Sequence, residues 1–148
     1  VEGQVGGTAE ASASAFSADR WFDTGDQGYL DEDNYLFIVG RSKDMIISGG
    51  YNVYPKEIEI VLDEVPGVLE TGVIGVAHPD FGEAVVAVVV CDGSIEVTDT
   101  ELAASLADTL ARFKHPKAYI RADQLPRNAM SKVQKAALRT THAELFTD

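Results

Sequence analysis

The sequence predicts a small α+β domain, a short β-sheet flanked by helices. Four apolar residues spaced i, i+3, i+4 and i+7 indicate an amphipathic helix. These residues are Ile58, Val61, Leu62 and Val65. Two valine-rich runs, residues 68–76 and 84–91, are typical of strands. In chain order the patterns read strand, helix, strand, strand, helix, strand, helix, which favours helices packed against one sheet.

A different segment precedes this domain. Residues 1–20 are rich in Gly, Ala and Ser, have little to bury, and are expected to be loosely ordered. Residues 28–30 and 35–39 are predicted strands, and the turn-forming residues 31–34 join them into a β-hairpin.

Residues 40–59 lead from the hairpin into the domain. A short apolar strand at residues 45–47 meets Gly49-Gly50, where glycine permits a sharp reversal of the backbone. Residues 51–53 resume the strand. Pro55 suits the first turn of the helix that follows, and Pro66-Gly67 ends that helix.

The remaining elements follow similar signals. The run at residues 84–91 is apolar on both faces, so both faces should be covered. Thr98 and Glu101 have capping-box spacing ahead of a second amphipathic helix with leucines at 102, 106 and 110. Residues 119–120 form a predicted short strand. Ser131 is expected to cap a last helix that runs to about Phe146.

The charge is uneven. The net charge of −12 argues against a nucleic-acid-binding protein, because phosphate contacts need Lys and Arg. Residues 112–139 nevertheless hold eight of the twelve basic residues and a single acid, Asp123. Two interpretations stay open: this segment binds an anionic partner, or it balances acidic residues across an internal interface.

The sequence also indicates a cellular setting. Cys91 is the single cysteine, so an intrachain disulfide is impossible, and a reducing, cytoplasmic location is expected. Neither a signal peptide nor an apolar run long enough to cross a bilayer is recognised, so no membrane association is expected.

Single residues suggest chemistry only weakly. Asp26 could accept hydrogen bonds from two neighbouring hydroxyls, as an acid does for a ribose, or pair with Asp23, or simply bond the backbone of its own turn. Arg41 could contact a phosphate or lie free on the surface. Lys132 is electrostatically misplaced at a predicted helix start, which hints at a function. The three histidines lack metal-ligand spacing, and no metal site is predicted.

Taken together, four ordered motifs carry more information. They are the Trp-Phe-Asp-Thr-Gly-Asp of residues 21–26, the Gly-Arg-x-Lys-Asp of residues 40–44, the Gly-Gly-Tyr-Asn-Val-Tyr-Pro-Lys-Glu-Ile-Glu of residues 49–59, and the Leu-Pro-Arg-Asn-x-x-x-Lys-Val of residues 125–133. Over about residues 10–146 the chain resembles the C-terminal part of the adenylate-forming enzymes. Its motifs are most similar to those of acyl-CoA synthetases, and among these to those of malonyl-CoA synthetases.

The resemblance implies two half-reactions. A carboxylate attacks the α-phosphate of ATP to give an acyl-adenylate and pyrophosphate, and the thiol of CoA then displaces AMP. A mobile C-terminal domain would rotate between the steps. Lys43 matches the family hinge, so residues 1–42 would be the tail of the large N-terminal domain and residues 43–148 the mobile domain.

The resemblance also implies roles for residues. Asp26 would hold the ribose, Arg41 would contact the nucleotide, and Lys132 would be the catalytic lysine of adenylate formation. The residues expected near CoA are Ser48, Gly49, Gly50, Tyr51, Phe81, Phe113, Lys114 and Lys117. The sequence departs from the family pattern at Ser131, where glycine is usual, and His115 stands where a more basic residue would help CoA binding.

The resemblance assigns the phosphate loop, the Mg²⁺-binding acid and the acid pocket to the N-terminal domain. This chain by itself is therefore not expected to catalyse the full reaction, and its acid substrate stays open. Two alternatives remain. The chain could belong to an adenylation domain that loads a carrier protein, or it could be a non-catalytic binding module of the same fold.

Overall fold

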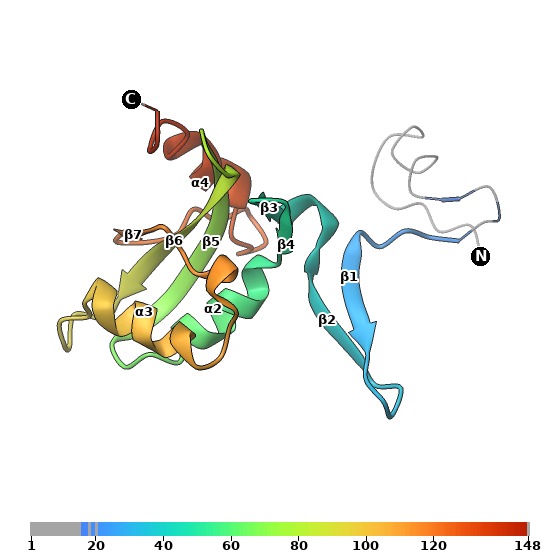
Figure 1. Cartoon of the computed structure of the whole chain (residues 1–148), viewed down its shortest axis with the longest axis horizontal. Helices are drawn as coiled ribbons and strands as arrows, with labels where there is room; N and C mark the ends of the chain where they lie inside the picture. Colours follow the sequence, from blue (N-terminus) through green and yellow to red (C-terminus); the bar gives the residue numbers. More distant parts are fainter. Residues whose placement is uncertain (1–15, 18, 20, 148) are drawn as a thin grey trace.

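The computed structural model describes Phe16, Ser17, Asp19 and residues 21–147. The loose order expected over residues 1–20 falls mostly outside this part. The first elements are β1 (Asp26–Leu30) and β2 (Leu36–Arg41), an antiparallel hairpin that projects away from the rest of the molecule (Figure 1). The Asp31 carboxylate accepts hydrogen bonds from the N–H groups of Asp33 and Tyr35, at 3.0 and 2.9 Å, and closes the turn.

A short connection leads from the hairpin into a second one. After the 3₁₀ turn η1 (Ser42–Asp44), β3 (Ile46–Ser48) pairs with β4 (Tyr51–Val53) in antiparallel fashion. Gly49 and Gly50, between them, have φ of 57° and 83°. Two successive positive φ values match the tight two-residue turn that suits the twist of a hairpin, which explains the glycine pair.

The main sheet contains five strands, of which four follow the order β4-β3-β6-β5 and the fifth, β7, also pairs with β6. The long strands β5 (Val68–His78) and β6 (Gly82–Cys91) are antiparallel, and β7 (Ala118–Arg121) runs parallel to β6. A mixed sheet with helices on it confirms the α+β prediction.

The sheet is covered on both faces. Helix α2 (Pro55–Asp63) and helix α3 (Asp99–Ala107) lie on one face, where Ile58, Leu62, Leu102 and Leu106 are fully buried. Along β6, Val85 and Val89 point to this face, whereas Val86 and Val88 point to the opposite core, which Leu138 helps to close. Alternation along the strand thus puts valine into two cores, as the run without polar residues predicted.

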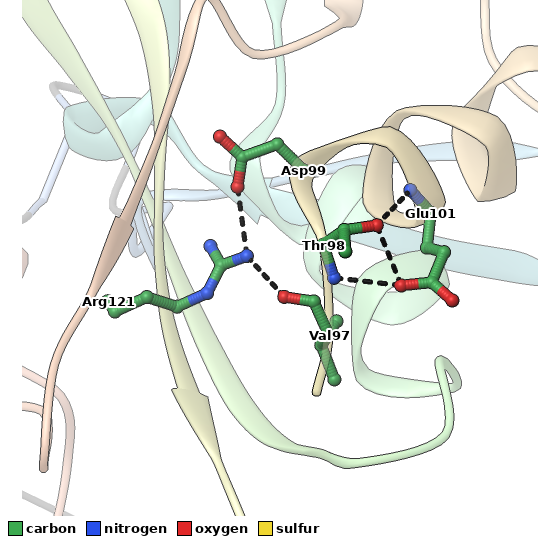
Figure 2. A network of polar contacts seen from close by, with 5 residues as sticks. All are labelled: Val97, Thr98, Asp99, Glu101 and Arg121. Atoms are coloured by element: carbon green, nitrogen blue, oxygen red, sulfur yellow. Dashed lines mark hydrogen bonds and ion pairs between the residues drawn. The ribbon is translucent and has the colours of Figure 1, made fainter. Parts of the chain in front are cut away.

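The predicted capping box is present at the start of α3. The Thr98 hydroxyl accepts from the Glu101 N–H at 3.3 Å, and the Glu101 carboxylate accepts from the Thr98 N–H at 2.8 Å (Figure 2). These hydrogen bonds from Thr98 lower the pKa of Glu101 below its ordinary value. Arg121 of β7 donates to the Val97 carbonyl at 2.7 Å and to the Asp99 carboxylate at 2.9 Å, and so ties the helix start to the sheet.

The predicted last helix is wrong at both ends. Helix α4 is Lys135–Thr141, and the residue that precedes it, Gln134, makes no side-chain cap. Ser131 is not a cap, because its φ of 60° turns the chain back before the helix begins. Beyond Thr141 the chain continues in turns. Lys132 therefore lies in a loop, so the argument from an unfavourable helix dipole does not apply to it.

Candidate functional site

The loop that carries Lys132 is closed on itself by hydrogen bonds. Residues 126–134 fold back so that Arg127 and Val133 form an isolated antiparallel bridge. The Asn128 side-chain oxygen accepts from the N–H groups of Met130 and Lys132, each at 3.0 Å. Arg127 donates to the Ser131 carbonyl at 2.6 Å and pairs with Glu70 of β5. The loop therefore presents the exposed Lys132 side chain from a braced backbone.

Lys132 lines a large hollow together with residues from distant parts of the chain. The hollow has a volume of about 980 Å³ and includes Arg41 at the end of β2 and Lys43 in η1. Six of its lining residues are cationic and one, Asp44, is acidic. The cations are Arg41, Lys43, Lys56, Lys132, Lys135 and Arg139. Such a surface is chemically suited to an anion of several charges, such as a polyphosphate.

Three of these cations are already neutralised, and one of them is Arg41, which pairs with Asp26. Lys135 forms an ion pair with Glu59 at 2.7 Å, and Arg139 forms one with Asp44 at 3.2 Å. Glu59 is buried and also accepts from the Val73 N–H at 2.9 Å, so this pair belongs to the core. Among the described residues, Lys43, Lys56 and Lys132 have no ion-pair partner, which leaves net positive charge in the hollow.

The Asp26 carboxylate is engaged within the hairpin. It pairs with Arg41 at 3.1 Å, directly across the register of β1 and β2. Asp23 accepts from the Gly25 N–H at 2.8 Å, so its side chain bonds its own turn rather than forming a carboxylate pair with Asp26. The structure thus brings Asp26 and Arg41 together and connects them, through Arg41, to the hollow that contains Lys132.

The basic segment divides into two groups. Five of the eight basic residues between 112 and 139 form ion pairs, namely Lys114, Arg121, Arg127, Lys135 and Arg139. Charge balance across internal contacts therefore accounts for most of the segment. In the part of the chain that the structure describes, Arg112, Lys117 and Lys132 are left without such a pair, and each lines a hollow.

Arg112 and Lys117 belong to a second hollow, of about 360 Å³. It brings together six of the eight residues that the sequence placed near CoA. They are Ser48, Gly49, Tyr51, Phe81, Phe113 and Lys117. The rings of Tyr51 and Phe113 stack at 4.6 Å, and the Lys117 ammonium lies 4.9 Å from the centre of the Phe81 ring. Exposed aromatic faces beside two cations suit an aromatic base that carries phosphate.

Two predicted residues are placed differently. Gly50 and Lys114 do not line the second hollow. Lys114 pairs with Glu57 of α2, although its ammonium also lies 6.0 Å from the centre of the Phe113 ring. Arg112, in the short 3₁₀ turn η2 (Arg112–Lys114), was missed by the site prediction. Its position next to Phe113 in a basic cluster was the available signal.

Other features of the described residues carry no predicted site residue. No helix among them is long and apolar enough to cross a membrane. Within the same residues, no group of three or more His, Cys, Asp or Glu could hold a metal ion. Two further hollows, of about 820 and 590 Å³, lie around residues 95–97 and include none of the predicted residues.

In the described residues, a mixed sheet with three helices, a lysine loop beside a cationic hollow and a separate hollow with aromatic and cationic residues define a small α+β domain with two cation-lined surfaces. The sequence profile of the AMP-binding enzyme C-terminal domain matches residues 57–132, and the chain belongs to this family.

The relatives carry the same domain within longer proteins. The chain is 42% identical over 130 residues to a putative acyl-CoA ligase, YdaB, of Bacillus subtilis, covering 88% of this chain and 25% of that protein. It is 46% identical over 134 residues to the long-chain-fatty-acid–CoA ligase FadD13 of Mycobacterium tuberculosis, covering 90% and 26%. The chain thus spans about a quarter of the length of these relatives.

A solved structure agrees with the sequence comparison. ATP-bound MatB from Rhodopseudomonas palustris superposes with a TM-score of 0.85 at 49% identity, over 93% of this chain and 27% of the MatB chain. The fold and the resemblance to acyl-CoA ligases predicted from the sequence are both confirmed.

Proposed function

We propose that this chain is the C-terminal portion of an AMP-forming acyl-CoA ligase, in which residues 43–148 form the mobile domain and residues 1–42 the tail of the N-terminal domain. The observation that carries the proposal is the cationic hollow. It gathers Arg41, Lys43 and Lys132, from segments about 90 residues apart, around one space, and two of them, Lys43 and Lys132, have no ion-pair partner among the described residues.

The hairpin supports the domain boundary. Its large apolar and aromatic residues are exposed, from Phe37 at 46% to Tyr35 at 68%. An isolated two-stranded hairpin is marginally stable in water, and an exposed apolar patch of this kind marks a surface that another part of the protein covers. We assign that part to the N-terminal adenylation domain, which places the boundary at Lys43, just after β2.

In the first half-reaction, a carboxylate oxygen of the acid bonds to the α-phosphorus of ATP while the bond to the bridging oxygen breaks and pyrophosphate leaves. Two anions must approach each other, so negative charge accumulates between them. The Lys132 ammonium stabilises that charge without transferring a proton. Arg41 contacts the nucleotide, and the Asp26 carboxylate, now paired with Arg41, accepts hydrogen bonds from the ribose hydroxyls.

In the second half-reaction, the CoA sulfur bonds to the acyl carbon, the bond from that carbon to the AMP oxygen breaks, and the thiol proton is lost. The second hollow binds the CoA nucleotide, with Phe81 and Phe113 against the base and Lys117 near the phosphates. The glycine turn after Ser48 brings Tyr51 to the pantetheine path. Lys114 contributes less than the sequence suggested, because Glu57 neutralises it.

We further propose that Mg²⁺ is bound by the N-terminal domain and that the enzyme is cytoplasmic. The acid is a separate question. Relatives at 41–46% identity are named for acids as different as sulfoacetate, indoleacetate and long-chain fatty acids, so identity in this domain does not select one. Malonate is the first acid to test, because the motifs of this sequence most resemble those of malonyl-CoA synthetases.

The decisive experiment separates the half-reactions in the intact enzyme. Lys132→Ala should abolish adenylate formation, measured as pyrophosphate release, but largely spare thioester formation from supplied acyl-adenylate. The matched control is Arg121→Gln, which removes one positive charge from a residue that lines neither the cationic hollow nor the second hollow, and it should leave both steps intact. If both half-reactions survive in Lys132→Ala, Lys132 is not the catalytic lysine.

A parallel assay tests the acceptor. Thioester formation with CoA supports the ligase, whereas transfer only to a phosphopantetheinyl carrier protein would favour the carrier-loading alternative. Failure of the intact wild-type enzyme to form any adenylate would favour the non-catalytic binding module.

A further inference from the structure

A chain of aromatic contacts links the end of the protein to the second hollow. The Phe146 ring lies 4.9 Å from the His78 ring, between centroids, and His78 lies 4.7 Å from Phe81. The next contact is the Lys117 ammonium, 4.9 Å from the centre of the Phe81 ring. Four side chains from three separate segments therefore form one continuous row.

Phe81 needs this support because of where it lies. It belongs to the turn between β5 and β6, and its side chain is 36% exposed. Its backbone carbonyl accepts a hydrogen bond from the Gly49 N–H at 2.9 Å, which ties this turn to the glycine turn. Without neighbours to hold it, a partly exposed ring would populate several rotamers, and fixing one of them would cost entropy each time a ligand binds.

His78 is itself held in place. Its Nδ1 accepts from the Asp80 N–H at 3.1 Å, which places the ring proton on Nε2 and fixes the plane of the ring. Phe146 packs against the His78 ring at an interplanar angle of 56° and borders an apolar hollow of about 510 Å³. Among the described residues, Phe81 and Phe146 are the two aromatic rings in contact with His78, so Phe146 limits the movement of His78 relative to Phe81.

We propose that His78 and Phe146 are positioning residues that hold Phe81 in the orientation that receives the CoA nucleotide. The inference rests on the proposed function, since CoA is the ligand. It assigns a role to the segment after α4, which the sequence analysis left without one. The segment from Lys132 to Phe146 would thus contribute to both hollows. Lys132 lines the first, and Phe146 helps to position Phe81 in the second.

The test compares two Michaelis constants in the intact enzyme. Phe146→Ala should raise the KM for CoA about threefold to tenfold, the range expected for losing one aromatic contact. Adenylate formation and the KM for ATP should stay unchanged. Phe146→Tyr should restore the wild-type KM for CoA, because the ring is kept. Leu145→Ala is the matched control, an exposed apolar neighbour outside the row, and should change neither constant.

Two additions keep the test decisive. Phe146→Leu removes the ring while keeping much of its volume, and it gives the same KM reading if the alanine variant unfolds. In the 148-residue chain itself, Phe146→Leu should shift the NMR signals of the Phe81 ring and of the Gly49 amide. An unchanged KM for CoA in both variants would overturn the inference while leaving the ligase in place. A wild-type enzyme that forms no thioester would instead overturn the proposed function.

Discussion

The side-chain oxygen of Asn128 accepts hydrogen bonds from the N–H groups of Lys132 and Met130, each at 3.0 Å, and the Asn128 N–H donates to the Lys132 carbonyl at 3.0 Å. Asn128 and Lys132 thus bond to each other in both directions. Asn128 thus fixes the backbone from which the proposed catalytic ammonium extends. It lines the hollow itself but carries no charge.

Asn128→Ala should therefore impair adenylate formation more than stability. The loop is exposed, so loss of the two side-chain hydrogen bonds should cost about 1 kcal/mol of unfolding free energy. Misplacing the ammonium should lower the rate of adenylate formation by about tenfold to a hundredfold, because that step depends on its position. Pyrophosphate release in the intact enzyme measures the rate, and thermal unfolding measures the stability.

The control for that variant is Asn128→Asp, which keeps an acceptor oxygen at the same place. It should retain the stability of the wild type. It should still slow adenylate formation, because its negative charge opposes the cationic hollow. If Asn128→Ala forms adenylate at the wild-type rate, the loop does not need Asn128 to position Lys132.

Ser131, just before the lysine, adopts a φ of 60°, a conformation in which side chains are strained and glycine is not. Ser131→Gly should therefore be neutral or stabilise the domain by up to about 1 kcal/mol, since relieved strain is partly offset by the greater freedom of glycine in the unfolded chain. Ser131→Val should destabilise it by about 1–3 kcal/mol, because a β-branched residue tolerates this conformation least.

Thermal unfolding of the two Ser131 variants in the 148-residue chain checks the prediction. A melting temperature for Ser131→Val equal to that of the wild type would mean that residue 131 is not held at positive φ. This position explains why the resemblance expects glycine here, and it replaces the helix cap that the local sequence suggested.

Local patterns in the sequence were sufficient for most of the fold. The alternation along β6, the apolar face of α2 and the capping box at Thr98 each depend on residues a few positions apart, and all three are present. The predicted start of the last helix was wrong because its apparent cap, Ser131, belongs to a loop that is closed by Arg127 and Val133. Helix-capping patterns do not describe such a contact.

The ion pairs were the feature of the structure that the sequence predicted least well. Lys114 pairs with Glu57 across 57 positions, and Arg139 pairs with Asp44 across 95. A basic run cannot reveal which of its members such distant acids will neutralise. Motif resemblance brought Arg41, Lys43 and Lys132 into one hypothesis, but only the fold shows that they line one hollow and that Arg112 lines another.

Tyr119 of β7 makes the stability of the domain sensitive to alkaline pH. Burial, reinforced by the nearby Asp99 carboxylate, raises the pKa of Tyr119 to about 12 from its ordinary value of 10.0. Its hydroxyl oxygen is buried and, within the described residues, has no hydrogen-bond partner. In the unfolded chain the same phenol ionises near its ordinary pKa, because water surrounds it.

Between these two values the unfolded state binds fewer protons than the folded state, so stability must fall as the pH rises. The neutral phenol contributes its full effect below about pH 10, and the loss is complete near pH 12. Because Tyr119 is only partly buried, we expect a loss of about 1–2 kcal/mol rather than the full value of the shift. Tyr119→Phe removes the titration and a buried hydroxyl without a partner, so it should be neutral or slightly stabilising at pH 7.

Chemical unfolding of the wild type and Tyr119→Phe at several pH values from 8 to about 11.5 tests this. The two stability curves should run parallel below about pH 9.5 and then diverge, with the variant less sensitive to alkali. Tyr35→Phe, at an exposed position in the hairpin, serves as the control for the loss of a phenol hydroxyl as such. Parallel curves across the whole range would show that Tyr119 ionises equally well in the folded domain.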